Sequence, residues 1–181
     1  MRSGLKRRLE YSDYAAIPPD GKRYEILRGD LSVTPAPSPQ HQRISRRLLV
    51  RFEEYFHARS VGEVFYAPID VILSPEDVVQ PDMIVVADPE QISQRGIEGP
   101  PLLVVEILSP STREYDRSVK ARRYAELGVR HYWLVDPEAR QIECHRLTSG
   151  AFRRVVAAEG EGTLIHPDWK GLAIELEALW R

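Results

Sequence analysis

The hydrophobic positions along this chain follow two different periods. Between residues 40 and 58, apolar side chains recur at helical spacing and arginines occupy the opposite face, which predicts an amphipathic helix with one face in the core. Shorter segments rich in Val, Ile and aromatic residues, separated by Pro, Gly or Ser, predict strands. The expected strands cover residues 24–27, 31–34, 63–66, 70–73, 83–86, 131–135, 142–147 and 152–157.

Turn residues indicate how some of these strands are connected. Arg28-Gly29-Asp30 separates the first two strands and predicts a hairpin, whose strands we expect at an edge of the sheet. Ser149-Gly150 predicts a second hairpin between the last two strands. Near the start, residues 11–17 form a short amphipathic segment, and residues 172–179 are expected to close the core.

Residues 102–108 form the most strongly apolar segment, interrupted only by Glu106. Such a run is typical of a central strand covered on both faces. A helix is expected after it, beginning at a capping box of Ser111 and Glu114 and ending at Gly128. No internal repeat or low-complexity linker is visible. We therefore predict an α/β fold, with a mixed α+β sheet flanked by helices, in one domain over residues 1–181.

The composition narrows the classes of function. Hydrophobic residues make up 43% of the chain and charged residues 29%, as in an ordinary globular protein. The formal net charge of −2 gives no general basic excess, so a polyanionic partner would need local patches. Cys144 is the single cysteine, which excludes an intrachain disulfide and a cysteine-rich zinc site. No signal peptide and no apolar run of about 20 residues is present, so we expect a cytoplasmic protein without a membrane partner.

Glu106 is the first candidate for chemistry. An ionised carboxylate in an apolar strand needs a partner, because burial otherwise costs several kcal/mol or raises the pKa. A metal ion, a lysine or a hydrogen-bond network would serve, and a structural salt bridge is the alternative to a functional role. Asp82 follows Pro81 at the start of another strand and could project at the same sheet edge, although such an Asp is often only a strand-start residue. Two carboxylates and a substrate phosphate are a usual ligand set for Mg²⁺.

Lys120 is the candidate cation. It follows Asp116 by four residues on the helix expected after the Glu106 strand, so the two side chains lie on one helical face. An ordinary surface ion pair is the simplest explanation of this spacing. The turn at residues 109–111 is short enough, however, for the helix to fold back over the strand and carry the amine toward the carboxylates.

Taken together, these segments resemble the PD-(D/E)xK nuclease superfamily. Pro81-Asp82 matches the first half of its motif, and Glu106-Ile107-Leu108 matches the second half except that leucine stands in place of lysine. In a large bacterial branch of restriction-endonuclease-like proteins the lysine has moved to the following helix, and this chain is similar to that branch over most of residues 24–137. The shared segments are residues 24–27, 37–41, 78–82, 103–112, 116–120, 124, 128–129 and 132–137.

The resemblance implies a restriction-endonuclease-like core with a metal-dependent active site. Asp82, Glu106 and the backbone carbonyl of Ile107 would bind Mg²⁺, with Mn²⁺ able to substitute. Lys120 would orient the attacking water or lower its pKa while the metal polarises the scissile phosphate. Glu25 is the counterpart of an upstream acidic residue that often joins the site, and a solvent-facing hairpin residue is the alternative. The implied activity is hydrolysis of phosphodiester bonds, in DNA, by an enzyme that as a homodimer would cut both strands.

Other functions and contacts stay open at this point. One alternative is a catalytically inactive nuclease-fold protein that binds nucleic acid or a protein partner, and another is a metal-dependent enzyme acting on a different phosphate ester. His41 could contact a phosphate, but a surface or capping role is simpler, so we leave it outside the catalytic set. Arginines on two helices could line a groove for phosphates, and solvated helix faces explain them equally well. They are Arg43, Arg47, Arg113, Arg117 and Arg123.

Overall fold

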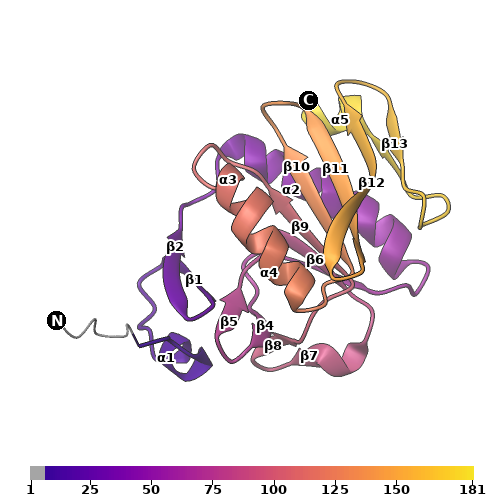
Figure 1. Cartoon of the computed structure of the whole chain (residues 1–181). Helices are drawn as coiled ribbons and strands as arrows, with labels where there is room; N and C mark the ends of the chain where they lie inside the picture. The colour runs from indigo at the N-terminus through magenta and orange to yellow at the C-terminus, as the bar shows by residue number, and fades with distance from the viewer. Residues whose placement is uncertain (1–6) are drawn as a thin grey trace.

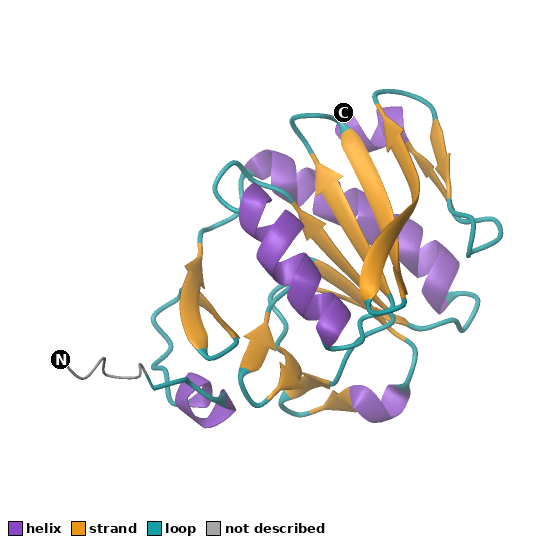
Figure 2. Ribbon diagram, in the orientation of Figure 1, coloured by secondary structure: helices purple, strands orange, loops and turns teal. Residues whose placement is uncertain are grey.

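Two mixed sheets organise the computed structural model, which describes residues 7–181 (Figures 1 and 2). The first sheet has six strands in the order β12-β11-β10-β9-β6-β3, with β9 and β10 parallel and the other neighbours antiparallel. The apolar segment around Glu106 therefore lies inside the sheet, as expected for a central strand. The strands are β3 (Glu63–Tyr66), β6 (Met83–Val86), β9 (Leu103–Ile107), β10 (His131–Asp136), β11 (Gln141–Thr148) and β12 (Ala151–Glu159).

The second sheet has six shorter strands in the order β2-β1-β5-β4-β8-β7. Its β1–β2 hairpin confirms the turn predicted at Arg28-Gly29-Asp30, but the expectation that both strands are edge strands is wrong. β1 also pairs with β5, a three-residue strand that the sequence pattern did not reveal. The strands are β1 (Arg23–Leu27), β2 (Asp30–Thr34), β4 (Val71–Ser74), β5 (Asp77–Val79), β7 (Ile92–Ser93) and β8 (Gly96–Glu98).

Helices cover both faces of the first sheet (Figure 1). The predicted amphipathic helix is α2 (Pro39–Phe52), which continues into a π-helical turn, η1 (Glu53–His57). On the opposite face, α3 (Arg113–Tyr115), the π-helical η3 (Asp116–Lys120) and α4 (Ala121–Glu126) follow β9. The remaining elements are α1 (Tyr11–Ala15), η2 (Pro89–Gln91), β13 (Thr163–Ile165), β14 (Ala173–Glu175) and α5 (Leu176–Trp180).

The alternation of side chains along β9 creates a core on each side of the sheet. Leu103 and Val105 belong to the cluster that packs with α2, whereas Val104 belongs to the cluster that contains Tyr124 of α4. Residues two apart in a strand point to the same face, so Glu106 points with Val104 toward η3 and α4. The tail also closes the first core as expected, because Leu172, Ile174, Leu176 and Leu179 are buried there.

One smaller sequence-based expectation needs correction. The capping box of Ser111 and Glu114 does not form, because α3 begins at Arg113 with Thr112 as its N-cap, and no side chain caps it. The hydroxyl of Ser109 instead lies 3.0 Å from that of Thr112 and 3.1 Å from that of Ser111. Cys144 lies in β11 and is fully buried. None of the helices in residues 7–181 combines the length and apolar character needed to cross a bilayer.

Candidate active site

Asp82 directly precedes β6 and is fixed to the neighbouring strand β9. Its Oδ2 accepts a hydrogen bond from the backbone amide of Ile107 at 2.8 Å and lies 3.0 Å from Nε2 of His41. The residue is only 8% exposed, so it is not simply a solvated strand-start aspartate. Because the amide of Ile107 belongs to the peptide that follows Glu106, this contact brings the two predicted metal-binding carboxylates to the same edge of the sheet.

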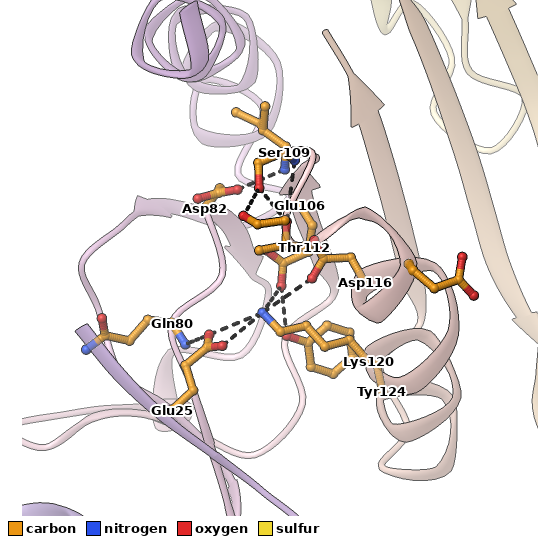
Figure 3. A network of polar contacts seen from close by, with 12 residues as sticks. Glu25, Gln80, Asp82, Glu106, Ser109, Thr112, Asp116, Lys120 and Tyr124 are labelled. Carbon is orange, nitrogen blue, oxygen red and sulfur yellow. Dashed lines mark hydrogen bonds and ion pairs between the residues drawn. The ribbon is translucent and has the colours of Figure 1, made fainter. Parts of the chain in front are cut away.

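Lys120 reaches this edge from η3, where Figure 3 shows its ammonium group between acidic side chains from two sheets. Its Nζ lies 3.1 Å from Oε1 of Glu106, 3.1 Å from Oε2 of Glu25 and 3.7 Å from Oδ1 of Asp116. The Tyr124 hydroxyl donates a second hydrogen bond to Oε1 of Glu106 at 2.9 Å. Lys120 is 6% exposed, so the simple explanation of a surface ion pair with Asp116 is excluded.

Glu25 joins the cluster from β1 of the second sheet. Its Oε1 accepts a hydrogen bond from the backbone amide of Gln80 at 2.8 Å, while Oε2 faces Lys120. The side chain is buried, which rules out the solvent-facing alternative considered for this residue. The structure thus brings Glu25, Glu106 and Lys120 into direct contact, with Asp82 held nearby through β9.

A cavity of about 350 Å³ opens onto this cluster. Its lining includes Glu25, Asp82, Glu106, Asp116 and Lys120, together with the loops at residues 34–38 and 108–112. The site therefore lies between the two sheets, where loops that carry Pro, Ser and Thr form the walls. A substrate that enters the cavity would meet the carboxylates and the ammonium group at the same time.

The electrostatics of the cluster leave an excess of negative charge. Burial raises the pKa of Glu106 to about 8; the Lys120 ammonium opposes this shift, and the neighbouring carboxylates of Asp116, Asp82 and Glu25 add to it. Burial also raises the pKa of Asp116. For Lys120, burial alone would lower the pKa, but the carboxylates of Glu106, Glu25 and Asp116 raise it well above the ordinary value. One ammonium thus faces three acidic groups, with Asp82 beside Glu106, so a further cation would stabilise the ionised cluster.

The donor set fits a hard divalent cation. Asp82 and Glu106 offer carboxylate oxygens, and the resemblance adds the carbonyl of Ile107, a residue that also lines the cavity. Both contacts to Glu106 fall on Oε1, and both contacts to Asp82 fall on Oδ2. Mg²⁺ prefers oxygen ligands and keeps several waters, so two carboxylates and a carbonyl are enough to hold it. The residues present are therefore compatible with the metal that the family resemblance implies.

The arginines proposed for a phosphate-binding groove are mostly engaged elsewhere. Arg113 pairs with Asp136, Arg117 with Glu143 and Arg123 with Asp77. Arg47 donates to the carbonyl of Leu179 at 2.9 Å, and Arg43 is exposed on α2. None of the five lines the cavity, so the structure does not support the groove.

Three residues of the site were not identified as such from the sequence. Arg23 lines the cavity and donates to Gln80, His41 contacts Asp82, and Tyr124 contacts Glu106. The signal for Tyr124 was its place one turn after Lys120, which puts both side chains on one face of the helix. His41 and Arg23 had no comparable local signal, because their partners are far away in the sequence.

Comparison with known proteins assigns this chain to a family. The family Uma2, described as "Putative restriction endonuclease", matches residues 11–177, which is most of the chain. The chain belongs to this family. The family resemblance inferred from the sequence is thereby confirmed, and a nuclease-like function is supported.

Two individual proteins extend the comparison. "Uncharacterized protein slr1290" of Synechocystis sp. (strain ATCC 27184 / PCC 6803 / Kazusa) is 29% identical over 126 residues, which cover 68% of this chain and 66% of that protein. The crystal structure of a "putative nuclease" from Anabaena variabilis ATCC 29413 superposes with a TM-score of 0.76 at 15% identity, covering 95% of this chain and 97% of that one. This match confirms the predicted fold class, a mixed sheet flanked by helices.

Proposed function

We propose that this protein is a Mg²⁺-dependent endonuclease that hydrolyses phosphodiester bonds in DNA. The observation that carries the proposal is the position of Lys120, whose buried ammonium lies 3.1 Å from both Glu25 and Glu106 in a cavity that Asp82 also lines. A structural salt bridge would need one acidic partner, whereas this cluster has more carboxylates than a single lysine can neutralise. The surplus charge and the open cavity favour a site that holds a cation and a substrate.

Each residue has a distinct role in the proposed reaction. Asp82, Glu106 and the carbonyl of Ile107 would hold the metal, which would supply Lewis-acid polarisation of the scissile phosphate. Lys120 keeps its proton, because its pKa lies well above the ordinary value. It therefore donates hydrogen bonds to the attacking water and does not act as a base. Glu25, outside the metal ligands, would accept the proton of that water.

The charge of the cavity favours a substrate that is held through the metal. Arg23 and Lys120 are the arginine and the lysine among its lining residues; Arg23 is hydrogen-bonded to Gln80, and Lys120 is paired with acidic side chains. Few protein cations are then available for substrate phosphates, so DNA binding at the site should depend on the divalent ion and change little with monovalent salt. As a homodimer the enzyme would cut both strands of a duplex.

Cleavage of supercoiled plasmid tests this function. The wild-type chain is incubated with Mg²⁺, Mn²⁺ or EDTA beside Asp82→Asn, Glu106→Gln and Lys120→Met, and Glu90→Gln on the exposed turn η2 serves as the control. We expect nicked or linear plasmid with either metal, none in EDTA, and a loss of about 100-fold or more in the three site variants only. Cleavage that survives all three substitutions would exclude this site, and metal-dependent binding without cleavage would support a binding protein instead.

A further inference from the structure

His41 is held rigidly at the mouth of the candidate active site. It lies in the first turn of α2, where its backbone amide donates to the side chain of Ser38, the N-cap, at 3.2 Å. The helix itself is anchored in the first core by Ile44, Leu48 and Phe52, each at most 1% exposed. The position of the imidazole is thus fixed by a 14-residue helix rather than by a loop.

The imidazole makes one directed contact with the site. Its Nε2 lies 3.0 Å from Oδ2 of Asp82, and the two side chains are 14% and 10% exposed. A carboxylate accepts hydrogen bonds, so the ring donates through Nε2. Nδ1 is buried and has no hydrogen-bond partner within residues 7–181. The tautomer with its proton on Nε2 therefore leaves no buried N–H group unpaired.

This contact matters because Asp82 receives two donors on the same oxygen. His41 approaches Oδ2 from α2, and the amide of Ile107 approaches it from β9 at 2.8 Å. Two donors from two rigid elements fix the plane of the carboxylate, and they direct its remaining lone pairs to other partners. In metal sites, hydrogen-bond partners behind a ligand hold its orientation, and their removal typically weakens metal affinity by about 10- to 100-fold.

We propose that His41 is a positioning residue for the metal site, which orients Asp82 for a divalent cation through the hydrogen bond to Oδ2. The inference rests on the proposed function, since it assigns His41 to the metal that this function requires. The alternative is that His41 only tethers α2 to the sheet. A tether would affect the stability of the fold but not the affinity of the folded protein for metal, so the two roles can be separated.

Mn²⁺ binding to the metal-free full-length chain, measured by calorimetry, tests the proposal without reference to cleavage. His41→Leu removes the donor, whereas His41→Gln keeps an N–H group at about the reach of Nε2. His57→Leu, at an exposed position in η1, is the matched control. Thermal unfolding of all four proteins in EDTA shows whether each is folded at the temperature of the titration.

We expect the Mn²⁺ dissociation constant of His41→Leu to be about 10- to 100-fold larger than that of the wild type. His41→Gln should recover most of the lost affinity, and His57→Leu should bind as the wild type does. Unchanged Mn²⁺ affinity in folded His41→Leu would overturn the proposal, as would an equal loss in the Leu and Gln variants. If the proposed nuclease function is wrong, the wild-type chain itself fails to cut DNA, which distinguishes that outcome from a failure of the His41 proposal. If wild type binds Mn²⁺ without cutting, the affinities of the variants still decide the role of His41.

Discussion

The ammonium of Lys120 lies 3.1 Å from Oε1 of Glu106, although the lysine follows 14 residues later on a π-helical turn. Both side chains are buried, and Glu25 contacts the same ammonium from the second sheet. The contact therefore links β1, β9 and η3 through one charge. Its removal has consequences for stability that can be measured apart from catalysis.

Substitution of Lys120 by Met should destabilise the metal-free protein. The variant leaves the carboxylates of Glu25 and Glu106 buried without their cation, and breaking a buried ion pair costs about 3–5 kcal/mol in the free energy of unfolding. Urea unfolding in EDTA at pH 9, above the pKa of Glu106, measures the loss. Lys170→Met removes an exposed lysine and is the control. A loss no larger than that of the control would mean that Lys120 does not neutralise the cluster.

The affinity for divalent metal should rise with pH. Burial raises the pKa of Glu106 to about 8 in the metal-free protein, so below that pH the carboxyl proton has to leave before the metal binds. We expect the Mn²⁺ association constant to increase by up to about tenfold per pH unit between pH 6 and 8 and to level off above. Calorimetric titration at several pH values checks this. Glu106→Gln should bind more weakly with a flatter profile, whereas a flat wild-type profile would contradict the role of Glu106 as a ligand.

Acid should destabilise the packing between His131 and His166. Burial lowers the pKa of both rings to about 4, and Trp169 packs against them with ring centroids at 4.4 and 4.3 Å. In the unfolded chain a histidine titrates near 6.5, so the unfolded state binds more protons between the two values. The contribution of the neutral, buried rings to the free energy of unfolding is therefore complete above about pH 6.5 and is lost as pH falls toward 4. Its upper limit is about 3 kcal/mol per ring.

Thermal unfolding between pH 7 and 4.5 measures this acid sensitivity. His166→Gln should show a shallower decrease in melting temperature than wild type, because one titrating ring is absent. His57→Gln, at an exposed position, should keep the slope of the wild type. Parallel curves of melting temperature against pH for wild type and His166→Gln would show that protonation of His166 does not contribute to the acid sensitivity.

Arg123 should stabilise the fold and contribute little to DNA binding. Its Nη2 lies 2.6 Å from Oδ2 of Asp77, which is fully buried in β5. Burial alone would raise the pKa of Asp77, but hydrogen bonds from Arg123 and Ser74 bring it below the ordinary value. Arg123→Gln should therefore lower the free energy of unfolding by about 2–3 kcal/mol, as expected when a buried charge loses its partner.

DNA affinity provides the second measurement on Arg123. DNA affinity is measured by fluorescence anisotropy with a labelled duplex in Mg²⁺. The Glu106→Gln protein and the same protein carrying Arg123→Gln should have dissociation constants within about twofold of each other. Arg122→Gln, an exposed neighbour on α4, should leave stability unchanged. A tenfold weaker DNA affinity in Arg123→Gln, without loss of stability, would support the hypothesis of an arginine-lined phosphate groove, which the ion pairs argue against.

Local patterns in the sequence predicted much of the framework. The 3.6-residue period placed α2, and the apolar run placed β9 inside the sheet with Glu106 on it. The same patterns missed β5, β7 and β8, which have at most three residues and are too short to show an alternation. They also gave no sign that the helix after β9 contains the π-helical turn that carries Lys120. That departure from regular spacing depends on packing against the sheet.

What the sequence alone determined is which side chains carry charge and which segments are apolar enough to be buried, because both are properties of the residues themselves. Which carboxylates share a cation was decided only by the tertiary structure. Glu25 lies 95 residues from Lys120, and His41 lies 41 residues from Asp82, so no local period links them. Strand pairing and helix packing bring these groups within hydrogen-bond distance, and the same topology pairs Arg113, Arg117 and Arg123 with acidic side chains outside the cavity.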